Sequence, residues 1–591
     1  MSRQILYCLL FFSFLGCNST PQSKKQELTE TLQEIEWENF ATETIDEEIV
    51  LLTENTTLYY EQDTLTLYNY FNMPDTILKK DIEAVRIGGV SSEIPFTINN
   101  KRNLKMLFVK NNETDFLMFN ENKGVYFYES EYNYISNDYV DISAIKDLKQ
   151  LSFIDLSYCG VETIPQNFKT LKQLKTVFLI GNYDLYDISN LPNIKHLVLN
   201  NCNLDRLPMG LEDKTNLTSL FLEGNNFSNL TELKTLVNLK QLSLADCNLS
   251  KVPYAIQDLK QLEFLNLSYN PSLNDFGSLN YYPHLTTLLI NNCNLVEIPF
   301  TVSFLTTLKH IDISNNKELI DFSYLSALKN IETLNMSNIE IETLPKVLSQ
   351  LPNLKHLDLT GCNSMLYYSE ISQMKSLTTL NLSHCDINVI PIEFKNNKQL
   401  KALYLADNIY LRDFSTLIYF KNLTILDVSE CDLKNIPLEF TKLPFLITLI
   451  LNNNDSLNDF SNLKSIKKLK HFSLNNSSLT KLPVDILKLI HLESLSLIYS
   501  ENLISINGIE KLKNLKELNL EGCDIYELPN EFEKLKKLQT LHLNYNQNLT
   551  DITVLFNMPS LIYLDLTSCS DIPQSQIDEL KRINPNIEII R

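Results

Sequence analysis

The sequence predicts a curved α/β solenoid, with a parallel β-sheet on its concave side and short helices or turns on its convex side. Three observations predict this fold. An apolar pattern returns about every 23 residues over most of the 591 residues, apolar and polar residues alternate at the start of each copy, and glycine occurs only 12 times. A single compact core is unusual at this length, whereas stacked repeats share one continuous core. The short alternation indicates a strand with one buried face in every copy.

The repeat itself opens with the pattern L-x-x-L-x-L-x-x-(N/C), and we number its positions from the first leucine. Nineteen repeats start at Leu151, Leu174, Ile194, Leu217, Leu239, Leu262, Leu285, Leu308, Ile331, Leu354, Leu377, Leu400, Leu423, Leu446, Leu469, Leu492, Leu515, Leu538 and Leu561. This motif, which covers about three quarters of the chain, resembles the leucine-rich-repeat family. The resemblance implies a horseshoe-shaped solenoid that binds partners on its concave face.

Two types of repeat alternate, so the full period is a pair of about 46 residues. Type one, such as 377–399, has cysteine at position 9 and Ile-Pro at 390–391; type two, such as 262–284, has Asn270 and Asp-Phe at 275–276. Proline is tolerated where a helical turn starts, and an Asp or Ser there can cap such a turn. Type one resembles the Ile-Pro repeats of Ras-suppressor-like and plant disease-resistance-like proteins. Type two resembles the repeats of bacterial internalins and of a phosphatase regulatory subunit.

Both ends of the array differ from its middle. We assign 151–583 to the array, 51–150 to an N-terminal cap with degenerate repeats, and 584–591 to a C-terminal cap strand that follows a helix at 575–583. The alternating stretch 58–71 predicts a hairpin that closes the N-terminal edge. Within the N-terminal cap, weaker versions of the repeat predict strands at 82–87, 104–112 and 132–140.

The first 50 residues predict export. Arg3 precedes an apolar run, Ile5–Leu15, that is too short to span a membrane as a mature helix. Residues 14–17, Phe-Leu-Gly-Cys, resemble a bacterial lipobox, although that family usually has an aliphatic residue in the place of the phenylalanine. The resemblance implies cleavage after a signal peptide at 1–16, lipidation of Cys17, and attachment to the periplasmic face or the cell surface. An ordinary secretory signal is the alternative. The polar residues 17–50 predict a tether.

Charge narrows the class of partner. The formal net charge of -21 disfavours nucleic acid and anionic membrane surfaces, so we expect membrane association only through the lipid. The sequence leaves the oligomeric state open.

The cysteines follow the repeat. Nine of the 11 occupy position 9: Cys159, Cys202, Cys247, Cys293, Cys362, Cys385, Cys431, Cys523 and Cys569. Two repeats span about 10 Å, which is too far for a disulfide, and only Cys362 and Cys385 lie on adjacent repeats. We therefore expect buried, unreactive thiols.

Catalytic and metal-binding motifs are not apparent, and we expect no cofactor, no metal and no enzymatic activity. One carboxylate pair is a candidate. Asp312 and Asp358 fall at position 5 of repeats two apart, about 10 Å by strand spacing, which is close to the separation used in inverting glycoside hydrolysis. Two solvated carboxylates on a polar sheet are the simpler interpretation.

A ligand would bind at positions 3, 5 and 7, which face the concave side and mostly carry Ser, Asn, Thr or Asp. Five apolar exceptions near the start of the array are candidate ligand-binding residues: Phe153, Phe178, Val198, Phe221 and Phe264. Tyr404, Ile425 and Ile450 form a second, smaller set. The alternative is that these side chains pack against each other or beneath the N-terminal cap. We predict a recognition protein that binds another protein; a polysaccharide is the alternative ligand, because aromatic residues beside Asn and Asp also suit sugars.

Overall fold

The computed structural model describes residues 142, 145, 148–279 and 282–591, and the backbone of seven short strands nearer the N-terminus. The chain forms two compact units, Met1–Asn316 and Lys317–Arg591. Each unit is described by itself.

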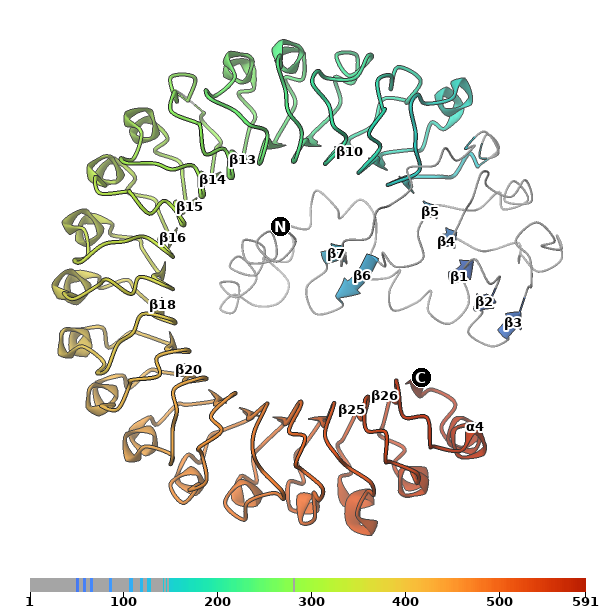
Figure 1. Ribbon diagram of the computed structural model, residues 1–591, viewed down its shortest axis with the longest axis vertical. Coiled ribbons are helices and arrows are strands. Elements are labelled where there is room, and N and C mark those ends of the chain that lie inside the picture. Colours follow the sequence, from blue (N-terminus) through green and yellow to red (C-terminus); the bar gives the residue numbers. More distant parts are fainter. Residues whose placement is uncertain are drawn as a thin grey trace. The chain divides into compact units, whose positions relative to one another are not determined.

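Parallel strands form the inner edge of both units (Figure 1). The repeats of the first unit contribute β8 (Phe153–Asp155), β9 (Thr176–Phe178), β10 (His196–Val198), β11 (Ser219–Phe221), β12 (Gln241–Ser243), β13 (Phe264–Asn266), β14 (Thr287–Leu289) and β15 (His310–Asp312). Consecutive strands pair in parallel and in register, so equal repeat positions face each other; Leu197, for example, is opposite Leu220. The predicted parallel sheet is confirmed.

The second unit continues the same pattern of parallel, in-register pairs. Its strands are β16 (Thr333–Asn335), β17 (His356–Asp358), β18 (Thr379–Asn381), β19 (Ala402–Tyr404), β20 (Ile425–Asp427), β21 (Thr448–Ile450), β22 (His471–Ser473), β23 (Ser494–Ser496), β24 (Glu517–Asn519), β25 (Thr540–His542), β26 (Tyr563–Asp565) and β27 (Glu588–Ile590). In every one of the 19 repeats, the strand covers positions 3 to 5.

The outer edge of each unit consists of 3-10 helices, which are the expected short helices. They are η4 (Gln166–Thr170), η5 (Thr231–Thr235), η6 (Tyr254–Asp258), η7 (Phe300–Phe304), η8 (Ser323–Ala327), η9 (Lys346–Gln350), η10 (Ser369–Gln373), η11 (Ile392–Asn396), η12 (Ser415–Tyr419), η13 (Leu438–Lys442), η14 (Leu463–Ser465), η15 (Ile486–Lys488), η16 (Ile509–Lys511), η17 (Asn530–Lys534) and η18 (Thr553–Asn557).

The two repeat types start these helices differently. In type one a proline with extended backbone precedes the helix, as Pro253 does at φ -58°. In type two an Asp accepts the N–H two residues ahead, as Asp321 does from Ser323 at 2.8 Å. This hydrogen bond holds the pKa of the exposed Asp321 carboxyl below its usual range. Proline and Asp thus each stabilise the backbone conformation at the start of a 3-10 helix that is too short to be stable alone.

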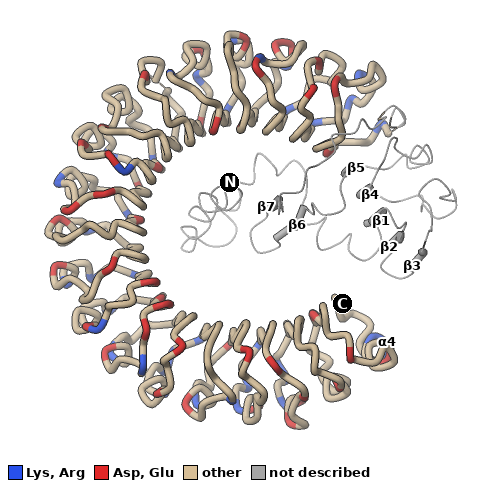
Figure 2. The backbone as a smooth tube through the Cα atoms, viewed as in Figure 1, with Lys and Arg blue, Asp and Glu red and all other residues tan. Residues whose placement is uncertain are grey.

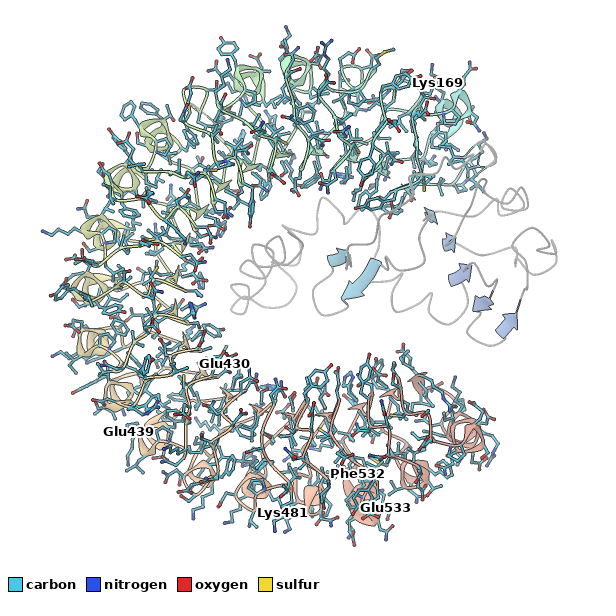
Figure 3. The ribbon with its side chains drawn as sticks, in the orientation of Figure 1. Lys169, Glu430, Glu439, Lys481, Phe532 and Glu533 are labelled. Atoms are coloured by element: carbon cyan, nitrogen blue, oxygen red, sulfur yellow. The ribbon has the colours of Figure 1, made fainter. Side chains whose placement is uncertain are left out.

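The core lies between the two edges and is built from the repeat leucines. Leu262, Leu265 and Leu267, at positions 1, 4 and 6 of one repeat, are all fully buried. From the outer edge, Phe532 of η17 also points into this core, whereas Glu439 and Glu533 point outward (Figure 3). Acidic and basic residues are interspersed along the outer edge of the described repeats (Figure 2).

Before the array, the backbone of the first unit already carries repeat-like strands. β1 (Ile49–Leu52) pairs in parallel with β4 (Ala84–Ile87), β4 with β5 (Met106–Val109), and β5 with β8. The strand predicted at 132–140 lies outside the described residues. β1 also begins inside the predicted tether. The predicted signal peptide, Cys17 and the remainder of the tether likewise lie outside the described residues.

Two hairpins accompany these strands. β2 (Thr57–Tyr59) and β3 (Thr64–Thr66) pair antiparallel and overlap the stretch 58–71 where a hairpin was expected, although β2 begins one residue earlier; β2 also pairs with β1. β6 (Leu117–Asn120) and β7 (Val125–Tyr128) form a second antiparallel hairpin that the repeat pattern does not predict.

At the other end, α4 (Gln574–Ile583) is followed by β27, which pairs in parallel with β26 and ends the ladder. The described part of the chain contains no helix that is long and apolar enough to cross a bilayer.

Candidate functional site

Position 9 is a structural ladder inside the protein. Asn270 shows how the Asn rungs work: its Oδ1 accepts the N–H groups of Cys247 and Leu249 at 3.1 and 2.9 Å, and its Nδ2 donates to the carbonyls of Leu244 and Leu267 at 2.9 and 2.8 Å. One buried amide therefore satisfies four backbone groups across two repeats. The Leu267 carbonyl also accepts the Cys293 thiol at 3.3 Å. Buried backbone groups need such partners because water does not reach them.

The cysteine rungs make a weaker contact. All nine are buried and free, which confirms the prediction for position 9. Cys362 and Cys385, the adjacent pair, each donate the thiol to a carbonyl of the preceding repeat, Met336 at 3.3 Å and Leu359 at 3.1 Å. Burial raises the pKa of the Cys362 thiol to about 12, which suppresses the reactive thiolate.

Position 5 has a structural role that the sequence pattern alone does not reveal. Where this position is Asp or Asn, the side-chain oxygen accepts the N–H of position 7 and closes the turn after the strand. The residues that do so are Asp155, Asn266, Asp312, Asn335, Asp358, Asn381, Asp427, Asn519 and Asp565. The fold therefore favours an acceptor at this position.

This role corrects the interpretation of the candidate carboxylate pair. Asp312 and Asp358 are not solvated: they are 3% and 8% exposed, and they accept the N–H groups of Ser314 and Thr360 at 2.9 and 2.8 Å. They belong to different units, and each has a sufficient structural explanation in its own turn. Neither supports the glycosidase candidate.

Three of the five candidate ligand-binding residues form one continuous row. Phe178, Val198 and Phe221 all occupy position 5, on the adjacent strands β9, β10 and β11, and are direct partners in register. Neighbouring strands are about 4.8 Å apart, so the three side chains are contiguous. All three are half-buried. We call these residues the apolar row.

The other two candidates lie elsewhere. Phe153 is only 1% exposed and packs edge-on against Phe178, with ring centroids 5.1 Å apart, so its prediction as an exposed contact is wrong. Phe264 is half-buried at position 3 of β13, opposite Gln241 of β12, and is therefore separated from the apolar row.

The second set in the sequence does not form a row. Tyr404 and Ile450 share position 5, but Asp427 lies between them in register, and Ile425 is at position 3.

One acidic residue beside the apolar row escaped the sequence analysis. Glu223 follows Phe221 by two residues, and its carboxylate accepts the Ser243 hydroxyl at 2.7 Å and the Asn200 amide at 3.3 Å. Burial raises the pKa of Glu223, and the nearby Asp246 raises it further. The sequence does contain an indication that Glu223 is unusual, because Glu521 is the only other acidic residue at position 7 of the 19 repeats.

Metal binding finds no support among the described residues, where no group of three or more His, Cys, Asp or Glu side chains is arranged to hold an ion.

Comparison with known proteins agrees with the repeat architecture. Residues 253–369 match the family described as Zer-1-like, leucine-rich repeats, and residues 376–397 and 514–535 match the leucine rich repeat family. No curated protein sequence matches the chain.

Three solved structures are similar. The TLR13 chain of a TLR13–ssRNA13 complex has TM-score 0.58 and 21% identity, over 83% of this chain and 82% of that one. A leucine-rich-repeat protein of Leptospira interrogans has TM-score 0.44 and 27% identity, over 67% and 95%. An internalin of Listeria monocytogenes has TM-score 0.31 and 20% identity, over 56% and 82%. With its 19 in-register repeats and these family matches, the chain is a leucine-rich-repeat protein.

Proposed function

We propose that the protein is a non-enzymatic recognition protein and that the apolar row binds a protein partner. One observation carries the proposal. Nine repeats use an Asp or Asn at position 5 to close the turn, whereas three consecutive strands replace it with Phe178, Val198 and Phe221. In the Phe221 repeat the N–H of position 7, Glu223, is accepted by the Asn200 side chain of the preceding repeat at 3.0 Å. All three repeats leave apolar side chains partly in water, which is unfavourable in the free protein. A binding role accounts for this cost.

A protein fits the row better than the other ligand classes. Leucine-rich-repeat domains generally mediate protein binding or recognition. In many repeats the Asp and Asn side chains that would suit a sugar are already used by the backbone. The solved TLR13 structure is a complex with RNA, but a net charge of -21 opposes binding to a polyanion here.

The direct test is photo-crosslinking in the native cell from a benzoylphenylalanine placed at Val198. We expect a protein adduct that disappears when Phe178→Ser and Phe221→Ser are combined, with a nearly unchanged melting temperature. Serine already stands at position 5 as Ser243, Ser473 and Ser496, so the strands tolerate it.

The matched control combines Tyr404→Ser with Ile450→Ser, which alters position 5 in the second unit and should leave the adduct intact. An adduct that survives loss of both phenylalanines would refute the proposal. Recovery of polysaccharide without any protein would instead favour the glycan alternative.

We also propose that a lipid on Cys17 attaches the protein to the outside of a bacterial membrane. The supporting observation is the sequence at 14–17, Phe-Leu-Gly-Cys, after a short apolar run. Cys17→Ser should move the protein from the membrane fraction to the soluble exported fraction. Continued membrane fractionation would exclude the lipid.

A further inference from the structure

We infer that the apolar row ends in an acidic subsite, formed by Glu223 and Asp246, that binds a lysine or arginine side chain of the partner next to its apolar residues. This inference rests on the proposed function and specifies the chemistry of the partner.

The geometry places the subsite at the end of the row. Glu223 is at position 7 of the repeat whose position 5 is Phe221, so both side chains belong to one strand and its following turn. Asn200 from the preceding repeat and Ser243 from the following repeat hold one carboxylate oxygen each. Glu223 is therefore fixed in place by donors on both sides.

These donors leave the charge uncompensated. An amide and a hydroxyl are neutral, and the charged group that acts on Glu223 is another acid, Asp246. Among the described residues neither carboxylate has an ion pair. Two acids at position 2 of their repeats do have them: Glu263 with Lys240 at 2.9 Å, and Glu332 with Lys355 at 2.6 Å.

Two half-buried carboxylates without a cation destabilise the free protein, because burial favours the neutral form of each. A cation from a partner removes this penalty on binding. Lysine and arginine suit the site because their aliphatic stems can lie along Phe221 and Val198 while the charged head reaches Glu223.

Charge also argues against residues 18–48 of the chain itself as the occupant. Residues 18–48 contain nine acidic and two basic residues, so this segment is repelled by the subsite. We therefore assign the apolar row and the acidic subsite to a separate protein.

The test selects a phage-displayed random peptide library against the full chain and three variants. The wild type and Glu521→Gln, the matched position-7 control, should both enrich peptides with lysine or arginine beside apolar residues. Glu223→Gln should abolish the cation enrichment and weaken the selected peptides about tenfold. Asp246→Asn provides a second, milder variant, and melting temperatures at or above the wild-type value show that both are folded.

The outcomes separate this inference from the proposed function. Unchanged cation enrichment with Glu223→Gln overturns the subsite, even if Phe178→Ser with Phe221→Ser abolishes binding and so supports the apolar row. If the selected peptides bind all of these variants as tightly as they bind the wild type, both the acidic subsite and the binding role of the apolar row are overturned. Displacement of the selected peptides by a synthetic peptide of residues 18–48 would make the chain's own segment the occupant and also overturn the inference.

Discussion

Replacing Asn270 with alanine should be far more damaging than replacing the cysteine one rung away. Asn270 is fully buried and satisfies two N–H groups and two carbonyls. The Leu267 carbonyl keeps the Cys293 thiol as a donor at 3.3 Å, so three groups lose their partner. An unsatisfied buried group costs about 1–3 kcal/mol, so three groups give a ceiling of about 9 kcal/mol. Water that enters the space left by the amide can recover part of this, and we expect a loss of about 4 kcal/mol.

Cys247→Ala is the matched control. Its thiol lies within hydrogen-bond distance of the Leu222 and Ala245 carbonyls, at 3.2 and 3.4 Å, and the Leu222 carbonyl also accepts the Asn225 amide at 2.7 Å. We expect a loss of about 1 kcal/mol, mostly from the lost volume.

Hydrogen exchange is the suitable assay, because a repeat array can unfold locally. In Asn270→Ala the amides of Cys247 and Leu249, which lose their acceptor, should exchange at least a hundredfold faster. In Cys247→Ala the amides of residues 247 and 249 should change less than tenfold. Equal acceleration in the two variants would refute the view that the asparagine rungs, and not the cysteines, hold neighbouring repeats together.

Three further predictions concern the titratable groups. With Ellman's reagent at pH 8, the nine repeat cysteines should react only after unfolding, because burial raises the pKa of thiols such as Cys202 and Cys431 to about 12; rapid labelling of most of them would contradict their burial. Lys214 is 4% exposed and donates to the Leu191 carbonyl at 2.9 Å, and burial lowers its pKa. Folding therefore disfavours its protonated form, so the free energy of unfolding, measured against Lys214→Met, should rise as the pH increases toward 10.5. Glu493 lies between Lys470 and Lys516, which lower its pKa to about 2. Its contribution, below about 1 kcal/mol after solvent screening, should be lost between about pH 4.5 and 2, and Glu493→Gln should remove that acid sensitivity.

The sequence by itself determined the repeat and everything that follows from its register. The L-x-x-L-x-L spacing specifies a strand at positions 3 to 5, because apolar residues at positions 4 and 6 must share one face. The same register places all nine cysteines in the core. It also indicated α4 and the last strand, since a stacked array needs an end that covers its open core.

The tertiary structure alone decided which concave residues are available. Phe153, at position 3, and Phe178, at position 5, both fall on positions that the pattern assigns to the concave side. Only Phe178 is partly exposed, whereas Phe153 is 1% exposed and packs edge-on against it. Asp312 and Asp358 looked solvated, yet each folds back onto its own backbone. Glu223 gained its environment from residues 23 positions before and 20 positions after it. Periodicity shows which way a side chain points, but its burial and charge depend on neighbours that only stacking brings together.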